Sequence, residues 1–547
     1  MTEATKRHGS SPPASSEPSG RRRDHCAGFV ALALAVYVAC ALWATWPAVR
    51  HIGDSYLARP AAGYGEAAAG DHLQLAWAFW LPGHQLEHGS APWADPYTFR
   101  PESEAAPNLQ GWLLGAPYWA FDRLLGHVWA YDLVVLLSFV LAGAVACWWL
   151  RALGVGRAAA LAGGVVFALA PYRVGQSTGH LLGLLAFLLP ATLLALERRR
   201  FVWAALALAA IPLSGQVHLA MGAVALSLGY AWARVPRIDW WKAGLGVLAA
   251  GGAGLLVHHV VVSGSVAGGG RSFAQVRHYS AELSDFVTRG VGAGVEELVF
   301  SGWVTPVLAL AGLWAARRVG SGLAWFLGLA ALLPCVLALG ANMPLYEPLW
   351  RVLPPLRVAR VPERLLPIAC LAIAALVALA LDFVAQSHKL RLPAAVVVAA
   401  AIVVLAVDLR VPVFGAVEPD RANGAYAAIR GDGRLFELPV FRPDIHLGSV
   451  YLAYARQAPR QRPQGYSTTA RRAADLLARE LRGLSCGRGS IPDTLGIRFV
   501  TVHRALYRQS GWFAAGCADA AEAALRRQGW TLLARDGAVS SWALPAG

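Results

Sequence analysis

Charged residues are scarce in this sequence. Only 15% of the 547 residues are charged, whereas 56% are hydrophobic and the mean hydropathy is +0.46. A soluble protein has about a quarter charged residues, so the deficit excludes an ordinary soluble domain and indicates lipid as the solvent. The net charge of +15 does not indicate nucleic-acid binding, because the basic residues recur as short clusters between apolar runs and form no single stripe.

Lysine is almost missing, and a nucleotide-binding signature is missing altogether. Lysine occurs only at positions 6, 242 and 389, which reflects a composition bias and indicates nothing about function. The glycine-rich strings near 249–270 lack the lysine of a P-loop and the preceding strand of a dinucleotide-binding unit. A cytoplasmic nucleotide-sugar donor is therefore not expected.

Long apolar runs dominate the chain from residue 25 to residue 413. Residues 1–24 begin with a stretch rich in Ser, Pro, Glu and Gly, and we expect a disordered cytoplasmic tail there. The predicted fold is an all-α polytopic membrane domain with about eleven transmembrane helices. The expected spans are 27–47, 131–150, 158–172, 181–196, 201–213, 217–233, 243–263, 298–316, 321–340, 364–386 and 392–413. The apolar stretch 112–125 would break the alternation of sides, so we interpret it as re-entrant or interfacial.

The short loops indicate the orientation. If the cluster Arg21–Arg23 is cytoplasmic, every short loop assigned to the cytoplasm carries basic residues. The segments 48–130, 264–297 and 341–363, and everything after residue 412, then lie outside a bacterial cytoplasmic membrane. The outside segments and the start of the next span hold arginines that go against the charge bias, among them Arg271, Arg277, Arg351, Arg357, Arg360 and Arg364. Cations kept on that side are candidates for binding an anion.

Residues 414–547 differ in pattern from the rest of the chain. Strand-like segments at 434–440 and 497–503, a helix-like segment near 470–484 and a terminal hairpin predict a small extracytoplasmic α/β domain. Its only cysteines are Cys486 and Cys517. They are a candidate disulfide, with two unpaired thiols as the alternative.

The first outside loop, 48–130, concentrates polar and aromatic residues. Leu73, Trp77, Trp80 and His84 are spaced for one face of a helix, and Asp71 lies at the expected start of that helix. Because Trp favours the boundary between water and lipid, we expect this helix to lie on the outer surface, with the Asp71 carboxylate at the mouth of the bundle. The alternative is that Asp71 only caps the helix. His84 and His88 are one helical turn apart, as in a metal-binding pair, although no further ligand is evident.

The order of several motifs resembles the GT-C class of polytopic glycosyltransferases, and most closely a bacterial YfhO-like branch. The motifs are GD-x2-Q-x2-W-x2-W (70–80), G-x2-PW-x-DPYTFRP (89–101), FALAPYRVGQSTGHL (167–181), LPATLLALERR (189–199), SAELSDF (280–286), EELVFSGW (296–303), RVPERLL (360–366) and LPVFRPDIHLG (438–448). The chain departs from that branch at 100–108, where RPESEAAPN replaces a Pro-Gly pair. The resemblance implies an integral membrane glycosyltransferase, a hexosyl- or pentosyltransferase, that takes a sugar from a polyprenyl phosphate. The acceptor would be a lipid, a glycan or a protein.

The resemblance also implies roles for single residues. Asp71 would be the general base or metal-linked activator of the acceptor, with Asp54 in reserve, because a carboxylate can take the proton of the acceptor hydroxyl. The leaving phosphate needs cations, and the candidates for binding it are Arg173, His180, Arg271, Arg277, Arg360 and Arg364. Weaker candidates for acceptor or metal contacts are Glu282, Asp285 and Glu296. A divalent metal ion is a possible cofactor with unknown ligands.

Structural explanations remain open for these residues. Arg173 and His180, with Gln176, could cap a helix or extend to the interface. Arg360 and Arg364 could form salt bridges with Glu363, and the carboxylates could be solvated loop residues. At the level of the whole protein, the alternatives are a transporter or flippase of lipid-linked glycans and a non-catalytic envelope scaffold. The spans contain few charges and no evident internal repeat, which argues against a transporter.

Overall fold

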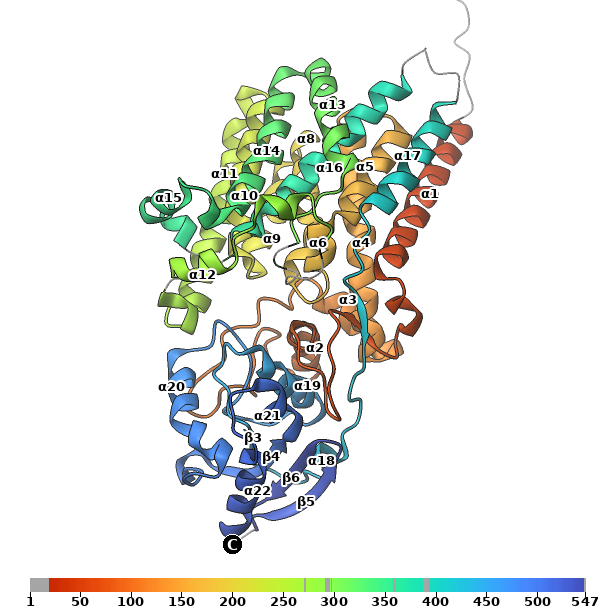
Figure 1. Cartoon of the computed structure of the whole chain (residues 1–547). Coiled ribbons are helices and arrows are strands. Elements are labelled where there is room, and N and C mark those ends of the chain that lie inside the picture. The colour runs from red at the N-terminus through yellow and green to blue at the C-terminus, as the bar shows by residue number, and fades with distance from the viewer. Residues whose placement is uncertain are drawn as a thin grey trace, which may run out of the picture.

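The computed structural model describes residues 19–545 apart from 270–271, 291–295, 297, 358–360 and 387–392. A bundle of long helices occupies one end of the molecule, and the chain after residue 414, here termed the C-terminal region, packs at the other end (Figure 1). Helices α2 and α3 lie between the two (Figure 1). Arg271, Arg360 and Glu297 fall outside the described residues, as does most of the expected N-terminal tail.

The helices of the bundle and of its outer loops follow the apolar runs of the sequence. They are α1 (Ser19–Thr45), α2 (Asp71–Glu87), α3 (Gly115–Leu125), α4 (His127–Ala152), α5 (Arg157–Leu169), α6 (Pro171–Gln176), α7 (Leu181–Leu184), α8 (Leu188–Glu197), α9 (Phe201–Leu213), α10 (Val217–Arg234), α11 (Trp240–Val257), α12 (Phe273–His278), α13 (Val304–Val319), α14 (Ser321–Ala338), α15 (Tyr346–Val352), α16 (Leu366–Ala385) and α17 (Ala394–Asp408). Helices α4, α5 and α16 pack together and are largely buried, whereas α11 and α14 present apolar side chains on the outside.

Five stretches of the described chain are long and apolar enough to cross a membrane: Ala27–Thr45, His127–Ala152, Arg237–Val262, Ser321–Ala338 and Pro362–Ala385. Four shorter apolar helices accompany them, so this is a membrane protein, and the count of about eleven spans stays a prediction. The expected span 181–196 is interrupted, because the chain turns between α7 and α8. Helix α3, within the stretch expected to be interfacial, has 11 residues and is too short to cross a bilayer.

The C-terminal region contains a mixed four-stranded sheet. Its strands are β3 (Arg434–Leu438), β4 (Ile497–His503), β5 (Thr531–Asp536) and β6 (Val539–Ala543). Their order is β3-β4-β6-β5, with β3 parallel to β4 and the other pairs antiparallel. The helices of this region are α18 (Gly424–Ala427), α19 (Ser449–Gln457), α20 (Arg472–Leu481), α21 (Arg504–Ser510) and α22 (Cys517–Arg527). The strands and the helix expected near 470–484 lie where the alternation of apolar residues indicates them.

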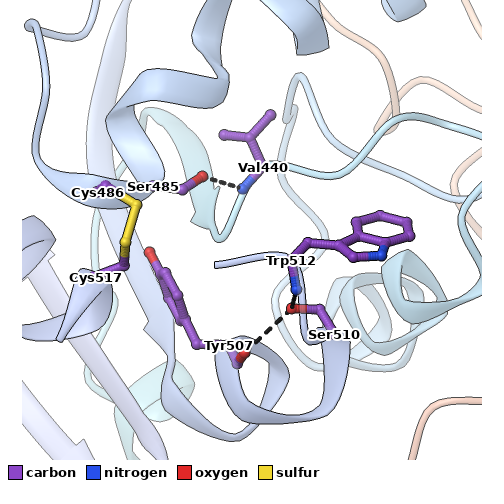
Figure 2. The surroundings of a disulfide bond; sticks show 7 residues. All are labelled: Val440, Ser485, Cys486, Tyr507, Ser510, Trp512 and Cys517. Carbon is purple, nitrogen blue, oxygen red and sulfur yellow. Dashed lines mark hydrogen bonds between the residues drawn. A yellow bond between two sulfur atoms is a disulfide. The ribbon is translucent and has the colours of Figure 1, made fainter. Parts of the chain in front are cut away.

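A disulfide joins Cys486 to Cys517 at the start of α22, so the paired alternative is the one in the structure. The Tyr507 ring lies beside the disulfide, and the neighbouring Ser485 hydroxyl accepts a hydrogen bond of 2.9 Å from the backbone N–H of Val440 (Figure 2). The disulfide therefore links the turn after α20 to α22, and both of these segments pack against the sheet.

The first outside loop is fixed to both halves of the molecule. Its strand β1 (Tyr56–Ala58) pairs with β2 (Gly415–Val417) at the start of the C-terminal region. On the bundle side, the carboxylate of Asp132 in α4 accepts hydrogen bonds from Gly53 N and Leu57 N at 2.9 and 2.8 Å. On the other side, the buried Glu66 carboxylate lies 2.6 Å from His503 Nδ1 of β4. Residues 53–66 therefore hold the start of α2 in a defined place.

Candidate functional site

Helix α2 places Asp71 at the junction of the bundle and the C-terminal region. Gly70 precedes the helix, and its N–H donates to the Ser449 hydroxyl of α19 at 3.0 Å. Asp71 lies in the first turn, where a carboxylate is favoured by the helix dipole. The turn between α6 and α7 packs directly on it, and Gly179 permits this approach because a Cβ there would lie 3.2 Å from Asp71 Cβ. His180 follows immediately, so its ring reaches the carboxylate.

Both oxygens of the Asp71 carboxylate are engaged. His180 Nε2 lies 2.9 Å from Oδ2, and the Tyr466 hydroxyl donates to Oδ1 at 2.8 Å. His180 Nδ1 lies 2.9 Å from Gln176 Oε1 of α6, so Gln176 fixes the orientation of the imidazole ring. Two fixed donors leave the carboxylate little freedom to rotate, which suits a group that must meet a substrate in one geometry. Asp71 is therefore more than a helix cap.

Two further charged residues extend this cluster. Glu296 Oε1 lies 3.9 Å from His180 Nε2 and 3.2 Å from Arg364 Nη2. Arg364 comes from the 3-10 turn Pro362–Leu365, which leads into α16. The structure thus unites four of the predicted residues in an alternating series of charges: Asp71, His180, Glu296 and Arg364.

The cluster changes the pKa values of its members. Burial would raise the pKa of the Asp71 carboxyl, but the hydrogen bonds from His180 and Tyr466 and the charge of His180 outweigh burial and hold this pKa well below its usual range. Burial would lower the pKa of His180, but the hydrogen bond to Asp71 and the charges of Glu296 and Asp71 raise it. Asp71 is accordingly ionised at neutral pH, which is the state that a carboxylate needs in order to accept a proton from a hydroxyl.

A cavity of about 360 Å³ adjoins the cluster. Tyr466 and Arg364 form part of its wall, together with Gln74 and Trp77 of α2. The loop at 105–110 and the facing ends of α10 and α11 also line the cavity. Three further groups that can carry positive charge line it: His218, His258 and Arg357. The cavity therefore combines several cationic groups with aromatic and neutral polar surface next to an ionised carboxylate.

Several predicted residues lie elsewhere. The Asp54 side chain is 82% exposed and pairs with Arg421, so the structure gives it no part in the cluster. Arg173 is fully buried in the bundle, where its guanidinium donates to the carbonyls of Ala168 and Gly183 and lies over the Phe139 ring. Its place near the end of an apolar run suggested the cavity, but the short helix α6 turns the side chain back onto α5.

Three other predicted residues lie on the exposed loop before α13. Arg277 is exposed and lies over the Phe273 ring. Glu282 is exposed and Asp285 is half-buried, and they share a short turn in which Glu282 N donates to Asp285 Oδ2 at 2.7 Å. The structure does not bring them to Asp71.

The structure also bears on the metal candidates. His84 Nε2 lies 2.8 Å from the Tyr97 hydroxyl, and the His84 ring stacks on Trp80. His88 contacts the His84 carbonyl through Nδ1. In the part of the chain that the structure describes, no three His, Cys, Asp or Glu residues form a group suited to a metal ion.

No pattern in the sequence indicates Tyr466, the second donor to Asp71. It follows Pro463, in a polar stretch 395 residues from its partner, and no periodicity or motif distinguishes it. His218 and His258 lie within the expected spans 217–233 and 243–263 and are not among the predicted site residues. A histidine near the end of an apolar run is a feature that could have identified them. Arg357 was found through its violation of the charge bias.

No protein-family model matches the sequence, and no curated protein matches it. Among solved structures, the chain is similar to the arabinofuranosyltransferase AftD from Mycobacteria, with a TM-score of 0.57 and 17% identity. That alignment covers 95% of this chain and 40% of AftD, so the chain spans less than half of the neighbour's length.

Two further neighbours have lower scores. The oligosaccharyltransferase from Archaeoglobus fulgidus, in complex with Zn and sulfate, has a TM-score of 0.49 and 13% identity, over 94% of this chain and 73% of that one. ArnT from Cupriavidus metallidurans, bound to undecaprenyl phosphate, has a TM-score of 0.42 and 14% identity, over 96% and 98%. At 17% identity, the likeness to AftD shows a shared fold.

Proposed function

We propose that this protein is an integral membrane glycosyltransferase that moves a sugar from a polyprenyl phosphate to a lipid, glycan or protein acceptor outside the cytoplasm. The observation that carries the proposal is the Asp71 carboxylate, held at both oxygens by His180 and Tyr466 beside a cavity lined by Arg364. The order of its motifs resembles that of the YfhO-like branch, to which we propose it belongs. The fold shared with AftD agrees with the class of reaction.

In the proposed reaction, an oxygen of the acceptor hydroxyl forms a bond to the anomeric carbon of the donor sugar. The bond between that carbon and the phosphate oxygen breaks, and the polyprenyl phosphate leaves with the electron pair. Asp71 accepts the hydroxyl proton as the new bond forms, a contribution of about 10²–10⁴ in rate for a positioned base. A divalent ion remains a proposed cofactor, and among the described residues no three His, Cys, Asp or Glu side chains form a group suited to hold it.

The leaving phosphate requires positive charge where it departs. Arg364 and Arg357 both line the cavity, and a guanidinium can bind phosphate through two parallel hydrogen bonds. The Arg364 guanidinium is paired with Glu296 at 3.2 Å, which fixes its orientation before the substrate arrives. We assign phosphate binding to these two arginines, assisted by His218 and His258, which line the same cavity.

The orientation of the protein is part of the proposal. The disulfide of the C-terminal region suits an oxidising compartment, and the basic turns of the bundle lie at the end away from that region (Figure 1). We therefore propose a bacterial cytoplasmic membrane, a cytoplasmic N-terminus and an extracytoplasmic domain at 414–547. Residues 466–469 would then contribute acceptor contacts from outside, since they line the cavity.

The test uses Asp71→Asn, which keeps size and removes the charge, in a strain that lacks the protein. Envelope glycans are compared by mass spectrometry after complementation with wild type or variant at equal membrane abundance. We expect Asp71→Asn to leave the glycan missing and the exposed Asp54→Asn, a matched carboxylate in the same loop, to restore it. Restoration by Asp71→Asn would overturn the assignment of the base and favour a transporter or a scaffold.

A further inference from the structure

A groove between α9 and α11 lies away from the candidate active site. It has a volume of about 640 Å³ and is bordered by Arg199, Arg200, Trp203, Trp241 and Lys242. The two helices approach closely below it, where a Cβ on Gly246 would lie 3.5 Å from Ala205. Bulky side chains at the beginnings of both helices border the groove above this contact.

The groove lies at the end of the bundle opposite the C-terminal region. Arg234 at the end of α10 pairs with Glu197 at the end of α8 at 2.6 Å, so the α8–α9 turn and the α10–α11 turn are neighbours. The start of α14 joins them, because a Cβ on Gly322 would lie 3.5 Å from Ala233. Three turns rich in basic residues therefore gather at one end, as expected for the cytoplasmic side of a membrane protein.

Two cations at the mouth of the groove have no acidic partner. Lys242 is neutralised by Asp239 at 2.7 Å and lies 5.5 Å from the ring centroids of Phe201 and Trp241. Arg199 and Arg200 are exposed, and within the described residues neither forms a salt bridge. Arg199 has a φ of 54°, in the left-handed region that residues other than glycine rarely adopt. The tight turn at Arg199 places Arg199 and Arg200 directly before the start of α9.

The rest of the groove is apolar and faces outward. Trp203 and Trp241 are 64% and 62% exposed, and Val202 and Leu245 beside them are also exposed. A soluble anion would leave this surface in water, whereas acyl chains would cover it while the headgroup meets the arginines. Tryptophan is the residue that proteins concentrate at this depth of the membrane.

We propose that the α9–α11 groove is a binding site for an anionic phospholipid, with the phosphodiester at Arg199 and Arg200 and an acyl chain between Trp203 and Trp241. The choice of an anionic lipid follows from charge. A zwitterionic headgroup would bring its own positive charge close to two guanidinium groups that form no salt bridge within the described residues. The proposal does not depend on the transferase reaction, since no residue of the groove lies in the Asp71 cluster.

The test uses purified full-length protein in neutral detergent and native mass spectrometry with added phosphatidylglycerol or phosphatidylcholine. We expect wild type to retain phosphatidylglycerol roughly tenfold more than phosphatidylcholine. Arg199→Ala/Arg200→Ala should remove this preference, and Trp203→Ala should weaken retention of both lipids. The control Arg317→Ala/Arg318→Ala removes two cations from the same end of the bundle, outside the groove, and should leave the preference unchanged.

Three results would overturn the proposal. The first is equal retention of the two lipids by wild type. The second is loss of the preference in the control pair as well, which would indicate general surface charge. The third is displacement of phosphatidylglycerol by millimolar inorganic phosphate, which would identify a site for a soluble anion. Size-exclusion elution at the wild-type volume shows that each variant is folded.

Discussion

Replacing His180 by glutamine should shift the pH dependence of transfer. The change removes the positive charge beside Asp71 and keeps a hydrogen-bond donor at position 180. The two side chains approach to 2.9 Å and are 23% and 32% exposed. Unit charges about 3 Å apart at an effective dielectric constant of about 20 interact by about 5 kcal/mol. Solvent screening at this exposure reduces the effect to about 2–3 kcal/mol, which is about 2 pKa units.

The direction of the change follows from the Asp71 pKa, which the hydrogen bonds of the cluster and the His180 charge lower against the effect of burial. Without the charge this pKa rises, so the carboxylate takes up its proton at a higher pH. We expect the acidic limb of kcat/KM in His180→Gln to lie about 2 units higher than in wild type. At pH 7 the variant should retain most of its activity.

The assay is transfer in proteoliposomes with a radiolabelled polyprenyl-phosphate sugar, measured from pH 2 to 8, and the acidic limb of His180→Gln should fall inside this range while the wild-type limb lies at or below its acidic end. Asp54→Asn is the control and should have the wild-type profile. An acidic limb that stays in place in His180→Gln would refute the reasoning, because Asp71 would then titrate independently of the imidazole. Stability gives a second readout. The contribution of the pair is present above pH about 4, where unfolded Asp ionises, and is lost as pH rises through the raised pKa of His180.

Three further predictions concern the C-terminal region. Tyr466→Phe removes the neutral donor to Asp71 and should raise the acidic limb of kcat/KM by about 1 unit in the same assay, half the effect of His180→Gln. Cys486→Ala/Cys517→Ala opens a loop with a sequence separation of 31 and should lower the free energy of unfolding by about 3–4 kcal/mol, measured by thermal and denaturant unfolding under oxidising conditions. Arg462→Met leaves the fully buried Glu437 without its cation and should cost about 3–5 kcal/mol, and adding Glu437→Gln should recover part of the lost melting temperature.

The positions of most helices could be predicted because lipid imposes a simple rule on composition. A run of apolar residues such as 131–150 has no alternative to a helix in that solvent, and α4 covers it. The rule fails where the chain makes a turn inside an apolar run. The span expected at 181–196 becomes α7 and α8, since the chain turns at Leu185–Phe187 although every residue there is apolar. Composition contains no information about such a turn.

The candidate site could be predicted in part, for a related reason. Asp71, His180 and Arg364 each lie next to an apolar run, and polar residues at such borders are few enough to be noticed. Arg173 satisfies the same criterion and lies elsewhere, because its direction depends on the six-residue helix α6. A position at the border of an apolar run thus identifies candidate residues. Only the packing of α5, α6 and α7 shows that His180 contacts Asp71, whereas Arg173 donates to the Ala168 carbonyl.

The C-terminal region forms part of the site and is more than an appended module. Several attachments join it to the loop that precedes and begins α2, among them the pairing of β1 with β2, the contact of Glu66 with His503, and the hydrogen bond of Tyr466 with Asp71. The residues of the first two do not line the cavity, so these attachments fix the region whether or not substrate is present. The third is partly exposed and lies on the cavity wall. A chain ending before β2 would therefore leave Asp71 with one donor and the cavity without one wall, and loss of transfer on truncation would follow from an incomplete site even if the bundle stayed folded.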